Sequence, residues 1–237
     1  MEFFQKIQQS KNPTIQSMSI QSNLNEIKAS LPAHVTLVAV SKTKPVPDLM
    51  EAYNAGQRIF GENKIQEMAG KYEEMPKDIE WQMIGHVQTN KVKYMASFVS
   101  LVHGVDSLKL LAEINKQANK NNRVINCLLQ IHIAEEETKF GMDESELNEL
   151  LSSYEFKQME NIKITGLMGM ATFTQDQKQV KKEFTHLSKI FQDLSKQPET
   201  RNFKPETLSM GMSGDYTIAI ECGSTIVRIG SSIFGHR

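Results

Sequence analysis

Short apolar segments alternate with longer amphipathic segments along most of this chain, and that alternation restricts the possible folds more than any other feature. The apolar segments are rich in Val, Ile and Leu and are predicted to be strands, whereas the segments between them keep the spacing of surface helices. Strands that alternate with helices pair in parallel. About eight such units in 237 residues predict a closed (β/α)₈ TIM barrel rather than an open doubly wound sheet. The expected strands span about residues 36–41, 58–61, 80–85, 98–103, 124–133, 162–168, 207–210 and 226–229.

The segments between these strands are predicted to be helices of the outer ring. They span about residues 47–55, 63–74, 89–97, 107–121, 143–153, 175–196 and 214–221. Ser213 is a candidate N-cap for the last of them. Ahead of the first strand, Pro13 breaks the pattern and a helix is expected from about residue 14 to residue 30. No linker or composition shift marks a second domain, so we expect residues 1–237 to form one domain, with residues 1–30 as a helical extension packed on the barrel.

The composition is that of an ordinary globular protein without a general affinity for polyanions. Charged residues make up 23% and the formal net charge is -1, so we expect neither nucleic acid nor a membrane as a partner. Cys127 and Cys222 have no metal-ligand spacing and suit a reducing compartment. No apolar run reaches bilayer length and the first residues lack a signal-peptide core. We therefore expect a cytoplasmic protein, and a monomer.

The first expected strand ends at Lys42, the most informative single residue. Side chains alternate faces along a strand, so Val38, Val40 and Lys42 share one face, which in a closed barrel can be the lumen. Desolvation favours the neutral amine, the form that condenses with an aldehyde or ketone. The alternative is that Lys42 only leans out of the barrel mouth and caps a carbonyl, with Lys44 equally solvated.

Two segments rich in Gly and Ser follow the last two expected strands, at residues 209–214 and 228–235. In barrels of this type, phosphate is frequently held by the loops after strands seven and eight. Small residues let backbone N–H groups approach an anion closely, and the first segment also opens a helix. An amine at the end of strand one and a phosphate cradle beside it would suit pyridoxal phosphate.

Six motifs carry a resemblance to the pyridoxal phosphate homeostasis protein family, called YggS or PROSC. The similarity runs from about residue 20 to the C-terminus, and its motifs are long and ordered. They lie at residues 39–45 (AVSKTKP), 60–63 (FGEN), 84–91 (IGHVQTNK), 166–170 (GLMGM), 208–213 (LSMGMS) and 227–235 (VRIGSSIFG).

The resemblance implies a fold like the N-terminal barrel of alanine racemase, with pyridoxal 5'-phosphate held as a Schiff base on Lys42. It also implies that Arg228 faces the pyridine nitrogen and that Ser213, Gly230 and Ser231 hold the phosphate. A guanidinium keeps its proton and donates to an unprotonated pyridine nitrogen, which leaves the ring a poor electron sink.

Two other residues have competing interpretations. Asn63 ends the second expected strand, and the resemblance implies contact with the cofactor ring, while an N-cap for the following helix is the alternative. His86 could act as an acid or base, but the sequence shows no partner to orient it, so we expect it to make structural hydrogen bonds at the barrel mouth.

The resemblance implies a protein that carries and buffers pyridoxal phosphate for PLP-dependent apo-enzymes and has no established catalysis. The alternative is a racemase-like PLP-dependent enzyme, or an aldolase-type barrel that uses Lys42 directly on substrate. Racemisation needs an acid or base on the cofactor face opposite the lysine, which the alanine racemases take from an additional domain. This chain ends soon after the eighth expected strand, so we expect no such domain, and we expect the carrier.

Overall fold

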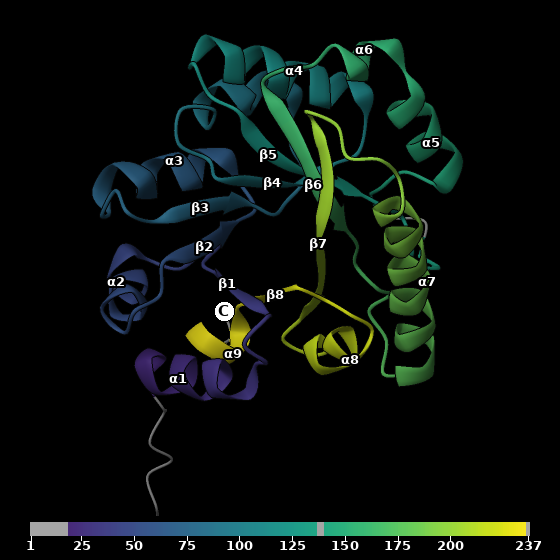
Figure 1. Ribbon diagram of the computed structural model, residues 1–237. Helices are drawn as coiled ribbons and strands as arrows, with labels where there is room; N and C mark the ends of the chain where they lie inside the picture. Colours follow the sequence, from purple (N-terminus) through teal and green to yellow (C-terminus); the bar gives the residue numbers. More distant parts are fainter. Residues whose placement is uncertain (1–18, 137–139, 236–237) are drawn as a thin grey trace, which may run out of the picture.

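Eight parallel strands close into a barrel in the computed structural model, which describes residues 19–136 and 140–235 (Figure 1). Each strand pairs with the next along the chain, and the eighth closes the barrel on the first. The predicted TIM barrel is therefore confirmed. The strands are β1 (Thr36–Val40), β2 (Ile59–Glu62), β3 (Glu80–Met83), β4 (Leu101–Val105), β5 (Ile125–Gln130), β6 (Ile162–Met168), β7 (Phe203–Met212) and β8 (Ile226–Ile229).

Helices surround the strands in the described part of the chain (Figure 1). The helix expected over residues 89–97 is instead the short 3₁₀ helix η1, and the strand expected over 98–103 begins only at Leu101. Two short helices, α6 and α9, were not predicted. The helices are α1 (Ile20–Ser30), α2 (Val46–Asn54), α3 (Ile65–Glu74), η1 (Thr89–Tyr94), α4 (Leu108–Lys120), α5 (Glu144–Ser152), α6 (Tyr154–Lys157), α7 (Gln177–Ser195), α8 (Tyr216–Glu221) and α9 (Ser231–Phe234).

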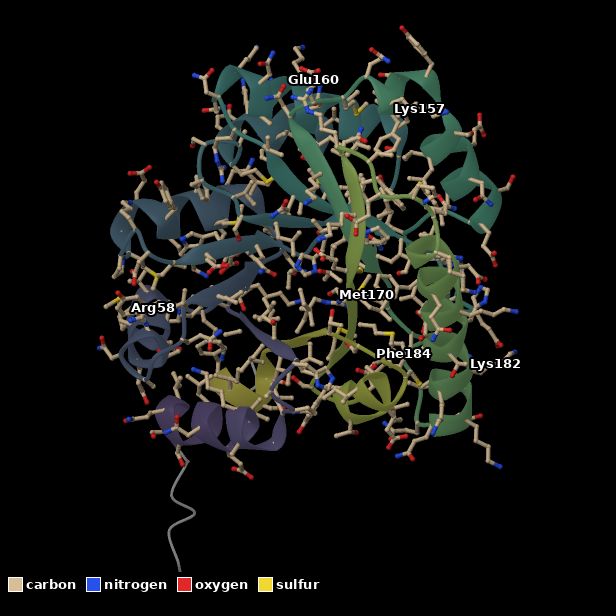
Figure 2. The ribbon with its side chains drawn as sticks, in the orientation of Figure 1. Arg58, Lys157, Glu160, Met170, Lys182 and Phe184 are labelled. Carbon is tan, nitrogen blue, oxygen red and sulfur yellow. The ribbon has the colours of Figure 1, made fainter. Side chains whose placement is uncertain are left out.

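The barrel wall separates two apolar clusters. The larger one lies between the strands and the helices, where Phe184 of α7 is fully buried, while Lys182 points away from the barrel on the opposite face of the helix (Figure 2). The smaller one fills the lumen and includes Val38, with Val40 and Met170 packed against it. Val38 and Val40 therefore share the lumen face of β1, as strand alternation predicts, and Lys42 lies in the turn just beyond the end of that strand.

Helix α1 packs outside the barrel, between the first and last helices of the ring (Figure 1). Asn23 donates from Nδ2 to the carbonyl of Ile233, 3.0 Å away, and Leu24 is fully buried. The helix begins at Ile20, after Ser19 as N-cap. The first part of the helix expected from residue 14 lies outside the described residues.

Three features of the sequence can be checked within residues 19–136 and 140–235. No helix there combines the length and the apolar character needed to cross a membrane. The same residues contain no group of three or more His, Cys, Asp or Glu side chains that could hold a metal ion. Cys127 is completely buried, and burial raises the pKa of its thiol, so the thiol stays protonated at neutral pH.

Candidate functional site

The turn after β1 fixes the backbone around Lys42. The N–H of Lys44 donates to the carbonyl of Ser41 over 3.1 Å, and Thr43 between them has a φ of 64°, in the left-handed region. Lys42 is half-buried at this turn. Lys44 is half-buried like Lys42, and its Nζ donates to the carbonyl of Phe234 in α9 over 2.7 Å. This bond ties the β1 turn to the loop that follows β8.

The loops after β7 and β8 are also bonded to each other. The N–H of Gly230 donates to the Oγ of Ser213 over 3.3 Å, and Ser231 follows at the exposed start of α9. The prediction that Ser213 is the N-cap of α8 is wrong, because Asp215 occupies that position. Asp215 instead accepts from the N–H of Met212, and thereby closes a tight turn in which Ser213 is free to face β8.

Glycine at position 230 allows the β8 loop to lie directly against β1. A Cβ at this position would come within 3.1 Å of the carbonyl oxygen of Val40. The carboxyl ends of β1, β7 and β8 therefore meet at one end of the barrel, where they bring Lys42, Ser213 and Gly230 into one region.

Arg228 projects from β8 into the lumen and is only 4% exposed. It donates from Nη1 to the Oγ of Ser209 over 2.6 Å and from Nη2 to the carbonyl of Gly169 over 3.1 Å. Burial lowers the pKa of the guanidinium to about 10, against the opposing effect of Asp215. Arg228 is therefore still cationic at neutral pH, as the sequence argument required.

His103 extends this polar network across the lumen. Its Nδ1 lies 3.0 Å from the Oγ of Ser209 and its Nε2 lies 2.7 Å from the Oε1 of Gln82. Burial, and then the charge of Arg228, lower the pKa of His103 well below its usual value. The imidazole is therefore neutral. Its Nδ1 accepts a hydrogen bond from the Ser209 hydroxyl and its Nε2–H donates one to Gln82, so both ring nitrogens are hydrogen-bonded.

Sequence reasoning missed Gln82, His103 and Ser209. The available signal was strand alternation. His103 shares the face of Leu101, a lumen residue, while Gln82 lies between Trp81 and Met83, and Ser209 between Leu208 and Met210, which all pack on the helix side. A polar residue at such a position needs a buried partner.

Asn63 follows β2 at the same end of the barrel and is half-buried. The alternative that it is the N-cap of α3 is wrong, because Lys64 occupies that position and makes no side-chain capping bond. A Cβ on Gly85 would lie 2.6 Å from the carbonyl oxygen of Asn63, so glycine after β3 is what allows the Asn63 backbone to pack there.

His86 does have an orienting partner, contrary to the sequence expectation. Its Nδ1 lies 3.4 Å from a carboxylate oxygen of Asp106. The ring also stacks on Phe140, with 4.4 Å between the ring centres. The side chain of His86 is 44% exposed, so this pair lies at the surface.

Comparisons with known proteins place the chain in a family. Residues 15–237 match the family described as alanine racemase, N-terminal domain. A protein of Aquifex aeolicus named pyridoxal phosphate homeostasis protein is 40% identical over 203 residues, which cover 85% of this chain and 86% of that protein. The chain belongs to the pyridoxal phosphate homeostasis protein family. A family member from Vibrio alginolyticus is 38% identical over 235 residues and is covered to 98%.

Solved structures extend the comparison to three dimensions. PipY of Synechococcus elongatus, determined with PLP bound, superposes with a TM-score of 0.82 at 32% identity, over 91% of this chain and 100% of PipY. Alanine racemase of E. faecalis superposes with a TM-score of 0.74 at 14% identity, over 92% of this chain and 58% of the racemase. The second comparison concerns the fold alone, and it confirms the predicted likeness to the alanine racemase barrel.

Proposed function

We propose that this protein binds pyridoxal 5'-phosphate at the carboxyl end of its barrel and serves in the homeostasis of that cofactor as a carrier. The observation that carries the proposal is the meeting of β1, β7 and β8, which gathers Lys42, the Gly230–Ser213 contact and the buried Arg228 in one region. The relatives named for PLP homeostasis and the PLP-bound PipY support it.

The residues present fit the chemical groups of this cofactor. Lys42 supplies the primary amine that bonds to the aldehyde carbon. Ser213 and Ser231 would offer hydroxyl and backbone N–H donors to the phosphate, and Gly230 would offer its N–H, which here donates to Ser213. The absence of a side chain at position 230 lets this loop lie close to β1. When bound, pyridoxal phosphate supplies an aldehyde that condenses with amines and a ring that withdraws electrons.

Arg228 and Asn63 complete the proposed site. Arg228 would donate a hydrogen bond to the pyridine nitrogen, and its pKa of about 10 keeps the guanidinium charged at neutral pH. Asn63, which follows the neighbouring strand β2, would contact the ring.

The same network argues for a carrier rather than a racemase-like enzyme. A guanidinium that keeps its own proton leaves the pyridine nitrogen unprotonated, so carbanions are weakly stabilised. His103, the imidazole nearest to Arg228 in the network, is neutral, fully buried and bonded through both nitrogens, and it is therefore not placed to exchange protons with a substrate. We further propose a cytoplasmic monomer whose partners are PLP-dependent apo-enzymes.

Loading and transfer experiments test the proposal. Wild type, Lys42→Ala and the exposed control Lys182→Ala are incubated with pyridoxal phosphate, and bound cofactor is measured after dialysis. Wild type and the control are expected to retain the cofactor and to restore activity to a PLP-dependent apo-enzyme, whereas Lys42→Ala retains little. Interconversion of amino-acid enantiomers by the loaded wild type, lost in Lys42→Ala, would instead establish the racemase-like enzyme.

A further inference from the structure

A buried ion cluster lies outside the barrel wall, next to Lys42, and the proposed cofactor contacts do not use it. The Nζ of Lys71 in α3 lies 2.8 Å from Oε1 of Glu62 and 2.7 Å from Oε1 of Glu67. The side chain of Glu62 is fully buried and that of Lys71 is 8% exposed. Removing such charges from water is costly, so an ion pair at this depth points to a role beyond stability.

The cluster contacts both peptide groups that flank Lys42. On the preceding side, Lys71 donates to the carbonyl of Ser41 over 2.8 Å, and the Ser41 hydroxyl donates to Glu62 over 2.6 Å. On the following side, the N–H of Thr43 donates to Oε1 of Glu67 over 2.6 Å. The three N–H donors of the Lys71 ammonium are all used, on Ser41, Glu62 and Glu67.

The backbone held in this way is strained. Thr43 is β-branched and has a φ of 64°, in the left-handed region that is unfavourable for residues other than glycine. Such strain persists only where the surroundings impose it. The bond from the Thr43 N–H to Glu67 is a charge-assisted one and can supply that constraint.

We propose that Glu67, Lys71 and Glu62 form a positioning clamp that fixes the Lys42 peptide, so that the amine meets the cofactor aldehyde in a reactive orientation. This inference rests on the proposed function. In the step concerned, Lys42 in its neutral form would form a C=N double bond with the aldehyde carbon, the C=O bond would break, and the oxygen would leave as water with the two protons of the amine. The clamp residues act through the backbone of Ser41 and Thr43.

Glu67 is the residue to vary. Lys71→Met would leave Glu62 buried without its cation and can fail to fold, whereas the side chain of Glu67 is 24% exposed and tolerates truncation. Glu67→Ala removes the acceptor of Thr43, and Glu67→Gln restores an acceptor without the charge. Glu74→Ala is the matched control, because it removes an exposed carboxylate from the same helix.

Two measurements test the clamp, one of them without cofactor. The first is amide hydrogen exchange at Thr43 in the cofactor-free proteins, and the second is the rate of pyridoxal phosphate capture, with the adduct mapped to Lys42. We expect Glu67→Ala to raise the exchange rate and to slow capture by about tenfold each, with both largely recovered in Glu67→Gln and unchanged in Glu74→Ala.

The outcomes separate the clamp from the proposed function. Equal Thr43 exchange in wild type and Glu67→Ala would overturn the clamp whatever the cofactor does. Faster exchange with unchanged capture would overturn the positioning role alone. A wild type that forms no adduct at Lys42 would refute the proposed function, and the positioning role with it, even if the exchange data show the Glu67 contact.

Discussion

The buried His103 makes the stability of this protein depend on pH in a way that can be calculated. Its folded pKa is well below the unfolded value of 6.5, first because of burial and then because of the charge of Arg228. Below pH 6.5 the unfolded chain therefore binds a proton that the folded chain does not. The contribution of the neutral His103 to the unfolding free energy is fully present above the unfolded pKa, and it is lost as the pH falls from 6.5 toward the folded pKa.

The expected size follows from one proton. Each pH unit below the unfolded pKa costs about 1.36 kcal/mol while the folded imidazole stays neutral, so a change from about pH 7.5 to about pH 5 should remove about 2 kcal/mol of unfolding free energy. His103→Gln can still donate to Gln82 and carries no titrating imidazole. The variant should lack this part of the pH dependence.

Urea unfolding of wild type and His103→Gln at the two pH values is the assay. Other groups with shifted pKa values, such as Glu62 and Asp215, occur in both proteins and cancel in the difference. His186→Gln, which removes a half-exposed imidazole, is the matched control. Parallel losses of stability in wild type and His103→Gln would refute the neutral, fully bonded imidazole.

Two glycines give further predictions. Gly230→Ala would place a Cβ 3.1 Å from the carbonyl oxygen of Val40, a contact that a small shift of the loop can relieve. We expect urea unfolding to show a loss of about 1 kcal/mol of unfolding free energy, and titration to show a loss of about tenfold in pyridoxal phosphate affinity. Gly166→Ala would place a Cβ 1.7 Å from the carbonyl oxygen of Thr207, where the backbone cannot move aside. We expect the variant to lose more than about 3 kcal/mol of unfolding free energy in urea, or not to fold. A urea midpoint close to that of wild type would contradict the close contact between β6 and β7.

The barrel was predictable because the local pattern of apolar residues indicates each strand and each helix. Apolar runs and amphipathic spacing gave eight units, and closure then followed from their number. The predicted ends of the strands were wrong where pairing with a neighbouring strand determines where a strand begins. Strand β7 begins at Phe203 although Pro205 argues against a strand, because the pairing with β6 shifts register between Ile164 and Gly166 and so leaves room for a residue without an N–H.

The proposed cofactor contacts were predicted from sequence motifs, whereas the hydrogen-bond and ion-pair networks around them were not. His103 and Ser209 are 106 residues apart, and alternation predicts the face of each but not the partner. The ion pair between Lys71 and Glu62 could not be predicted from the sequence, because a lysine on a surface helix is normally solvated. Such contacts depend on how β2 and α3 pack, which a one-dimensional pattern does not contain.

The central claim is that Lys42 holds pyridoxal phosphate covalently. Borohydride reduction of the cofactor-loaded protein, followed by peptide mapping, tests it most directly. We predict one reduced adduct, on the peptide that contains Lys42, and the loss of the visible absorption band in Lys42→Ala. No adduct, or adducts scattered over surface lysines, would contradict it, and the Gly-Ser loops after β7 and β8 would then need a different phosphorylated ligand.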